Sequence, residues 1–230
     1  MTSSGTYNFS LSNADVIEDA YARLNIRRTA LLAEHLNDGW KALNLALVKF
    51  DNLQPNLWKS ETETVALVAS TATYTLEAKD VNILSCFIRT GTGTSQNDRT
   101  IYPISTTEYT SYPNKNLEGF PTVFWFNRQI TPEITFWPVP DQTSYYTAYL
   151  KVVRQVQDAN LPGGETPDVP LRFLDALIAE TSYRLSRAWR PELEDKRKQD
   201  AIDAWTIAAT QDVENVPMTI VPSVGTYYGR

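Results

Sequence analysis

The segments Thr122-Val123-Phe124-Trp125-Phe126 and Glu133-Ile134-Thr135-Phe136-Trp137 decide the fold class of this chain. Both are short runs rich in aromatic and β-branched residues, which favour β-strands. Residues 129–132 between them have the composition of a turn, and Pro138-Val139-Pro140-Asp141 closes the pair. We therefore predict two neighbouring strands near the middle of the chain, joined by a turn.

Further strand-like runs surround this pair on both sides. Each is separated from the next by a turn-rich piece, such as the glycine-containing segment 91–98. The runs are Thr62–Val68, Thr71–Leu76, Val81–Arg89, Arg99–Ile104 and Tyr145–Gln155. About seven strands at short spacing predict an antiparallel β domain, and the pattern leaves open whether it is a sandwich or a barrel-like sheet.

Helical periodicity replaces the strand pattern towards the start of the chain. Ser12 and Asp15 stand three residues apart, as in a capping box, ahead of an apolar helical stripe that begins at Val16. A longer helix is expected from Thr29 to Asn52, although Gly39 lies inside it. Its apolar stripe consists of Leu32, Leu36, Trp40, Leu43, Leu47 and Phe50.

Two more helices are expected after the strands. Pro170 suits the first turn of one of them. Its apolar face is made of Leu174, Leu177, Ile178, Thr181, Leu185 and Ala188. Pro191 restarts the last helix, which should end near Asn215, and acidic residues occupy its first turn, where the helix dipole favours them. Its buried stripe is predicted to contain Ala201, Ile202, Trp205 and Ala208.

The order of these elements predicts a mixed α+β fold. Amphipathic helices at both ends must bury their apolar faces, and the simplest solution packs them as an antiparallel helical bundle with the β domain inserted between its halves. The predicted units are residues 1–55 and 161–215 for the bundle, 56–160 for the β domain, and 216–230 for an extended C-terminal arm. The arm is mostly apolar and has no charged side chain before Arg230.

The composition is that of an ordinary soluble globular protein. Hydrophobic residues make up 42% and charged residues 21% of the 230 residues. The net charge of −6 argues against a protein that grips nucleic acid through phosphate contacts, which needs clustered lysine and arginine. No apolar run approaches the ~18 residues that spanning a membrane requires, and the first residues lack the pattern of a signal peptide. A single cysteine excludes an internal disulfide framework and fits synthesis in a reducing cytoplasm.

No complete catalytic, cofactor or metal site can be nominated from the sequence. His35 lies mid-helix beside the apolar stripe, where packing or a surface position explains it better than general-base chemistry. Cys86 lies in an apolar strand, where cysteines are usually inert. A glycosidase needs two acids that face one cleft, and the sequence leaves that open for Glu61 and Glu133. We expect a protein that is not an enzyme and holds no cofactor or metal.

Aromatic residues are dense in the middle of the chain, and two explanations compete for them. They could line a platform for sugars, or alternate rings could fill the core of the β domain while the others meet neighbouring subunits. The second explanation is favoured. The residues concerned are Tyr102, Tyr109, Tyr112, Phe124, Trp125, Phe126, Phe136 and Trp137.

Several motifs, taken in order, resemble one family of viral proteins. The aromatic strand at 122–126 leads to the turn Trp137-Pro138-Val139-Pro140-Asp141. A strand that ends in Val153-Arg154 follows, and then Pro167-Asp168-Val169-Pro170 ahead of a helix. Trp40 also lies inside a leucine-rich helix. Over most of the chain this order resembles the head-to-tail adaptor (connector) proteins of tailed phages, including the tubular tail protein A adaptors of short-tailed phages.

This resemblance implies a structural component of the virion, located at the head–tail junction and made in the host cytoplasm. It implies a ring, usually of twelve copies, that is stacked beneath the portal and forms a channel for the genome. The partners are then other copies of the chain, the portal protein and a downstream tail or nozzle protein. DNA passes through the lumen without sequence-specific binding, and no membrane is involved. The alternative is an aromatic-rich carbohydrate- or receptor-binding module of a phage tail.

The resemblance also implies where the contacts lie. In adaptors of this kind the C-terminal extension typically docks on the portal, and the β domain faces the next tail component. By position, the docking residues here are Met218, Ile220, Val221, Val224, Tyr227 and Tyr228. Contacts to neighbouring subunits or to the tail are expected at Arg184, Arg187, Arg190, Tyr112 and Trp125.

Overall fold

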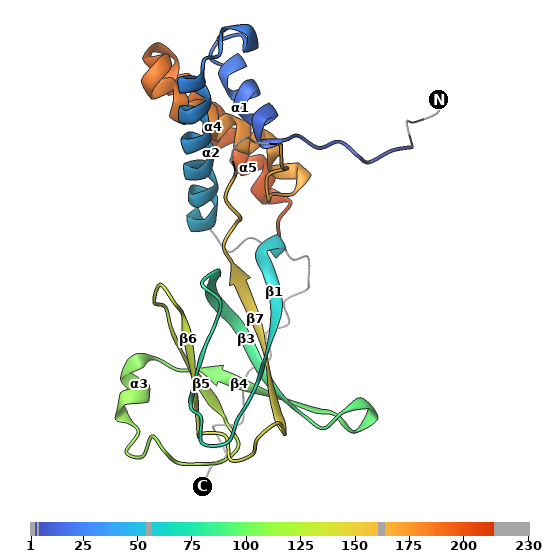
Figure 1. Ribbon diagram of the computed structural model, residues 1–230, viewed down its shortest axis with the longest axis vertical. Coiled ribbons are helices and arrows are strands. Elements are labelled where there is room, and N and C mark those ends of the chain that lie inside the picture. The colour runs from blue at the N-terminus through green and yellow to red at the C-terminus, as the bar shows by residue number, and fades with distance from the viewer. Residues whose placement is uncertain (1–2, 4, 54–56, 161–163, 214–230) are drawn as a thin grey trace, which may run out of the picture.

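The computed structural model describes residues 3, 5–53, 57–160 and 164–213. Four of the five helices in these ranges gather at one end of the long axis of the molecule, and the strands lie at the other end together with the short helix α3 (Figure 1). The helices are α1 (Asn13–Ala22), α2 (Ala33–Leu53), α3 (Thr106–Ser111), α4 (Leu174–Trp189) and α5 (Glu194–Thr210). The strands are β1 (Ser60–Ala66), β2 (Thr73–Thr75), β3 (Asp80–Thr90), β4 (Asn97–Pro103), β5 (Val123–Asn127), β6 (Glu133–Trp137) and β7 (Tyr146–Arg154). The mixed α+β fold class is confirmed.

The capping box at the start of α1 is confirmed. The Ser12 hydroxyl accepts a hydrogen bond from the backbone N–H of Asp15 (3.2 Å), and the Asp15 carboxylate accepts one from the backbone N–H of Ser12 (3.0 Å). These two bonds satisfy N–H groups that the first turn of a helix leaves without partners. Hydrogen bonds from the side chain and backbone of Ser12 also hold the pKa of the Asp15 carboxyl below its usual value.

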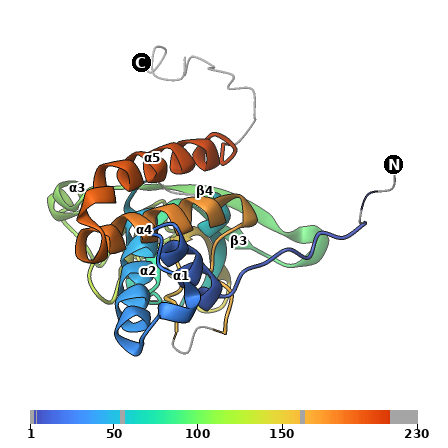
Figure 2. The ribbon, with the colours of Figure 1, turned by 90° about the horizontal axis from the view of Figure 1, so that it is seen from above.

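Helix α4 lies at the centre of the helical end. It packs against α1, α2 and α5, and in Figure 2 it lies between α5 on one side and α1 and α2 on the other. Its residues are buried on several faces, from Ala176 through Ser182. Tyr21 of α1 is fully buried and donates a hydrogen bond from its hydroxyl to the carbonyl of His35 on α2 (2.7 Å). One apolar cluster therefore unites helices from the two ends of the chain.

The predicted helical stripes are partly wrong at the helix ends. Leu32 and Leu36 are exposed, because His35 takes the inward position at the first turn of α2 and stacks on Trp189 with 4.0 Å between ring centroids. The 3-10 turn η1 (Arg28–Ala30) also separates the expected helix start from α2. On α5, Ile202 is exposed while Ala201 and Ala208 are buried.

The strands form one sheet in the order β1-β7-β3-β4-β5-β6-β2, which curls into a half-barrel (Figure 1). Neighbouring strands are antiparallel except β4 and β5, which pair in parallel at Tyr102 and Pro103. The prediction of a purely antiparallel domain is wrong at this pair. A parallel pair needs a connection that crosses back along the sheet, and here the segment that contains α3 supplies it.

The inner face of the curled sheet holds a second apolar core. Along β7, the alternate residues Tyr146, Ala148, Leu150 and Val152 are buried, as expected when one face of a strand meets a core. Phe124 and Phe136 from the central strands join them. This cluster shares no residue with the cluster between the helices. The helical end and the sheet are therefore packed separately, and their relative placement depends on the contacts between them.

Gly39 allows close packing of α1 against α2, which leads to a first prediction. A Cβ atom at this position would overlap the Cγ2 methyl of the buried Ile17. Overpacking of this kind costs about 1–3 kcal/mol, whereas alanine gains up to about 1 kcal/mol over glycine in a helix. We expect Gly39→Ala to lower the free energy of unfolding by about 1–2 kcal/mol in urea titrations.

A double-mutant cycle provides the control for this prediction. In an Ile17→Ala background the clash is absent, so adding Gly39→Ala should be neutral or stabilising. If Gly39→Ala stabilised the otherwise unchanged protein as well, the close approach of the two helices described above would be wrong.

Candidate functional site

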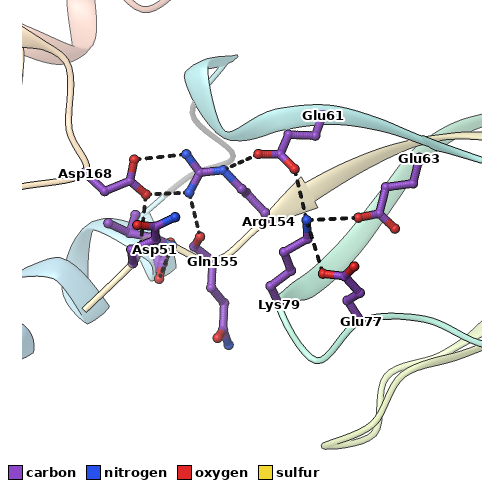
Figure 3. Close-up of polar contacts among 10 residues, drawn as sticks. Asp51, Glu61, Glu63, Glu77, Lys79, Arg154, Gln155 and Asp168 are labelled. Carbon is purple, nitrogen blue, oxygen red and sulfur yellow. Dashed lines mark hydrogen bonds and ion pairs between the residues drawn. The ribbon is translucent and has the colours of Figure 1, made fainter.

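A cluster of charged residues joins the sheet to the helices between the two ends of the molecule (Figure 3). The last turn of α2, the starts of β1 and β3 and the end of β7 all supply side chains to it. We call this cluster the junction. It consists of Asp51, Lys59, Glu61, Glu63, Glu77, Lys79, Asp80, Arg154 and Asp168.

Arg154, the last residue of β7, links the two sides of the junction. Its guanidinium binds both carboxylate oxygens of Asp168, in the segment before α4, with 3.0 Å between Nη2 and Oδ1. Its Nε lies 2.6 Å from a carboxylate oxygen of Glu61 on β1. Only 14% of the Arg154 side chain is exposed. A planar guanidinium held by two carboxylates has little freedom to turn, so it fixes the exit of the chain from the sheet.

Asp51, in the last turn of α2, ties the helices to the same place. Its carboxylate accepts hydrogen bonds from the Lys59 ammonium (2.7 Å) and from the backbone N–H of Val156 (3.2 Å). Lys59 lies just before β1, and its side chain is only 2% exposed. A buried ammonium is stable only when it is paired, and Asp51 supplies the partner.

The Lys79 ammonium forms ion pairs with three carboxylates on the sheet side of the junction. Its Nζ lies 3.2 Å from Glu61, 3.2 Å from Glu63 and 3.3 Å from Glu77. Hydrogen bonds to Glu63 and Glu61 raise the pKa of Lys79 above its usual value. Glu61 therefore bridges two of the three cations of the junction, Lys79 and Arg154, as Figure 3 shows.

Asp80 is the buried carboxyl of the junction. Burial, reinforced by the charge of Glu63, raises the pKa of Asp80 from 3.8 to about 6. Its Oδ2 accepts a hydrogen bond from the backbone N–H of Glu77 (3.1 Å). The register of β3 against β7 shifts between Asp80 and Asn82, and such bulges bend a strand. The bend lies where β3 enters the junction.

A cleft of about 540 Å³ opens beside the junction. Val48 of α2, Val81 of β3 and Val156 supply apolar side chains to it, while Lys79 and Arg154 lie at its edge. Both cations are already paired within the chain. Three carboxylates, Asp51, Glu61 and Asp158, also line the cleft, and the first two are paired with cations of the junction. The cleft therefore combines an apolar patch with charged groups that are largely paired within the chain.

The candidates for chemistry raised by the sequence fit structural roles. Cys86 is buried in the sheet core, and burial raises the pKa of its thiol to about 12, which keeps it protonated. His35 accepts a hydrogen bond at Nδ1 from the backbone N–H of Leu32 (3.2 Å). Within the described ranges, no three histidine, cysteine or acidic side chains lie close enough to hold a metal ion. No helix in these ranges is long and apolar enough to cross a membrane.

The aromatic residues of the sheet divide into a core set and a stacked outer set. Phe124 and Phe136 are buried in the sheet core. On the outer face, Tyr109 of α3 stacks on Trp125 (5.3 Å between ring centroids), and Tyr112 stacks on Trp137 (4.1 Å). The indole N–H of Trp137 donates to the carbonyl of Asn114 (3.0 Å). The favoured explanation is confirmed for Phe124 and Phe136, which fill the core. Contact of the outer rings with neighbouring subunits stays a prediction, and their stacking on each other leaves less free aromatic surface for a sugar.

The three arginines predicted at a subunit interface have partners within the chain. Arg184 lies 3.0 Å from Glu180. Arg187 lies 3.1 Å from Glu194, and Arg190 lies 3.6 Å from Glu192. Their contact with another subunit stays a prediction, as does that of Tyr112 and Trp125.

The predicted portal-docking residues lie outside the described part of the chain. They are Met218, Ile220, Val221, Val224, Tyr227 and Tyr228.

Sequence reasoning missed the junction as a unit. Arg154 and Asp168 appeared only as members of a motif order, although the structure shows that they pair with each other. Glu61 was considered as a catalytic acid, and it instead bridges two cations. The only sequence signal was the placement of charged residues at strand ends, which does not specify their partners.

Comparison with protein families identifies a relationship over most of the chain. The family model described as SU10 adaptor protein matches residues 11–219, which include the helices, the sheet and the junction. No curated protein sequence matches the chain.

The geometry of Arg154 leads to a second prediction. Arg154→Met removes the cation that pairs with Asp168 and Glu61 and leaves their carboxylates without it. Because breaking a largely buried pair leaves uncompensated charge, we expect the free energy of unfolding to fall by about 2 kcal/mol or more. Arg190→Met, at an exposed pair, is the matched control and should change it by less than about 0.5 kcal/mol. Equal effects in urea titrations would show that the junction contributes no special stability.

The raised pKa of Asp80 leads to a third prediction. The folded protein holds this proton more tightly than the unfolded chain, so the contribution of Asp80 to stability is lost as pH rises from about 4 to about 6. Asp80→Asn removes the titration but keeps an oxygen that can accept the Glu77 N–H. We expect the free energy of unfolding of the original protein, relative to Asp80→Asn, to fall by roughly 2 kcal/mol across this window. A difference that stayed constant from pH 4 to 7 would contradict the assignment.

Proposed function

Since the chain belongs to the SU10 adaptor family of phage proteins, we propose that it forms a ring that joins the portal of the head to the tail. The ring has twelve copies and surrounds a channel through which the genome passes. In this proposal the protein is a structural part of the virion at the head–tail junction, it is made in the host cytoplasm, and it catalyses no reaction.

The match to the family model carries this proposal. It begins ahead of α1 and continues past α5, so it covers both ends of the molecule. A match limited to the helices or to the sheet would support only a shared building block. The separate cores at the two ends add physical support, because each end can present its outer surface to a different partner.

The proposal gives each unit of the chain a role. Residues 1–55 and 161–215 act as one antiparallel bundle, and residues 56–160 form the β domain that meets the downstream tail or nozzle protein. Residues 216–230 form an arm that docks on the portal, with Tyr227 and Tyr228 as anchors, because aromatic residues supply much of the energy at interfaces. Apolar composition without charge before Arg230 supports a buried destination for this arm.

The charge of the protein suits a channel for DNA. The net charge is −6 per chain, so a ring of twelve copies carries about −72. A negative lumen repels phosphate, which lets the genome slide through without binding to a particular sequence. Each copy contacts two neighbours through a heterologous interface that closes by rotation. The arginines Arg184, Arg187 and Arg190 on α4 and after it, together with Tyr112 and Trp125, are proposed members of the contacts around the ring.

Binding to the portal protein of the same phage tests this function and is the fourth prediction. Purified chain mixed with purified portal should form complexes that electron microscopy shows as twelve-fold rings stacked on the portal. Deletion of residues 216–230 should abolish docking, because it removes the apolar arm. A Tyr227→Ser and Tyr228→Ser variant should weaken docking at least tenfold, which corresponds to about 1.4 kcal/mol.

The truncated protein needs a control for folding. Its far-ultraviolet circular dichroism and its urea midpoint should match those of the full chain, because the truncated protein keeps every residue of the two cores described above. If the full chain did not bind portal at all, the adaptor function would be wrong. If the truncated chain bound normally, only the role of the arm would be wrong.

A further inference from the structure

The segment 5–11 ahead of α1 has the sequence pattern of a strand that lacks a partner. Its apolar residues Tyr7, Phe9 and Leu11 alternate with the polar residues Asn8 and Ser10. Alternation with period two places the three apolar side chains on one side of an extended chain. The segment has no charged side chain. We call residues 5–11 the N-terminal arm.

The N-terminal arm projects away from the body of the molecule. It leaves the helical end sideways in both views (Figures 1 and 2). Tyr7 is 98% exposed and Phe9 is 67% exposed, whereas Leu11 packs against the helical core. Within the part of the chain that the structure describes, no backbone hydrogen bond joins residues 5–11 to another segment.

The base of the arm is held firmly, so its direction is set. The backbone N–H of Asn13 donates to the carbonyl of Glu165 (2.8 Å), and the capping box fixes Ser12. A segment of seven residues spans at most roughly 23 Å when extended. Phe9 still borders a shallow pocket that Pro167 and Leu171 of its own chain also line, whereas Tyr7 is almost fully exposed. The arm can therefore offer both rings, Tyr7 above all, to a neighbouring copy.

An apolar surface that suits these rings lies on α2. Leu45 and Val48 are 54% and 53% exposed, and their spacing of three residues makes them neighbours on one face of the helix. Val48 also lines the cleft of about 540 Å³ beside the junction, and Val81 and Val156 add apolar side chains to the lining of this cleft. In both views, α2 and the arm lie on opposite sides of α1. We call this surface the α2 face, made of Leu45, Val48, Val81 and Val156.

We propose that the N-terminal arm of one copy packs Tyr7 and Phe9 against the α2 face of the next copy. A projecting element on one side and a receiving surface on the other side produce a heterologous contact, the kind that closes into a ring. The charges suit this occupant. Lys79 and Arg154 at the cleft are paired within their own chain, and so are the carboxylates of Asp51 and Glu61. Asp158 also lines the cleft, and the arm carries no negative charge that this carboxylate would repel.

The surface area that Tyr7 and Phe9 can bury is smaller than that of a stable protein interface. Aromatic side chains bury roughly 150–250 Å² each, so two rings supply about 300–500 Å². A stable interface usually buries about 800 Å² on each partner. The arm is therefore an addition to a wider contact between neighbours, and the inference rests on the ring of the proposed function.

Cysteine crosslinking between copies tests the contact and is the fifth prediction. The variant Phe9→Cys, Val48→Cys is mixed with portal and treated with a short bifunctional maleimide. Cys86 is left in place because it is buried and its thiol stays protonated. A heterologous contact links each copy to two neighbours, so denaturing gels should show a ladder that extends beyond the dimer. The matched control, Phe9→Cys with Ile207→Cys on the exposed side of α5, should give at least tenfold less crosslinked product.

Each outcome has a distinct meaning. A ladder from the first pair alone supports the proposal. Crosslinked dimers without higher species would mean a two-fold contact, and a link within single chains would mean that the arm folds back; either result overturns the proposal. Portal complexes that form without any crosslink overturn the arm contact but leave the adaptor function intact.

If the chain did not bind portal, the adaptor function would fail on its own. The arm contact would then be decided by the same crosslinking of the isolated protein at high concentration. A ladder there would support copy-to-copy packing, and its absence would overturn it.

Discussion

The relative placement of the helices and the sheet depends chiefly on one charged network, because the two ends of the molecule share no apolar core. Leu57 and Trp58, just before β1, add contacts to the helical end outside that network. Arg154 at the end of β7 binds Asp168 on the way to α4 and Glu61 on β1. Asp51 in the last turn of α2 binds Lys59 and the chain that leaves β7. Hydrophobic packing is not directional, whereas a bidentate guanidinium pair holds one geometry. The junction therefore orients two bodies that packing alone would leave free to turn.

This constraint suits a protein that links two partners. An adaptor must hold the portal on one side and a tail component on the other in a defined relation, and a loose connection would allow neighbouring copies to tilt differently. In the junction, burial raises the pKa of Asp80, which favours its neutral form, and hydrogen bonds to Glu63 and Glu61 raise the pKa of Lys79, which favours its charged form. The rigidity of the junction therefore depends on which of these carboxyls carry a proton.

Local features of the fold were predictable from the sequence. The Ser12–Asp15 capping box and the bounds of β6 follow from interactions between residues close in the chain. The parallel pairing of β4 with β5 and the inward place of His35 depend on distant segments, which periodicity does not describe. Glu180 is a further case: its pair with Arg184 lies within α4 and is visible in the sequence spacing, whereas its pair with Lys49 of α2, 2.7 Å away, is not.

The candidate site was less predictable than the fold for the same reason. Each charged residue of the junction looks like an ordinary surface residue until the end of β7, the start of β1 and the last turn of α2 are brought together. The aromatic residues were easier, because alternation in β5 and β6 already separates Phe124 and Phe136 from Trp125 and Trp137. Alternation does not predict the position of α3, whose Tyr109 stacks on Trp125 at the outer face of the sheet.

Distance measurement by electron–electron double resonance between spin labels on the two ends tests the central claim most directly. Labels at Asp203→Cys on α5 and Lys151→Cys on β7 lie on exposed positions of the helical end and the sheet. The account predicts one narrow distance distribution, which broadens when Arg154 is replaced by Met. A broad distribution in the protein with Arg154 intact, or a narrow one that survives its loss unchanged, would show that the junction does not set the relative orientation of the two ends.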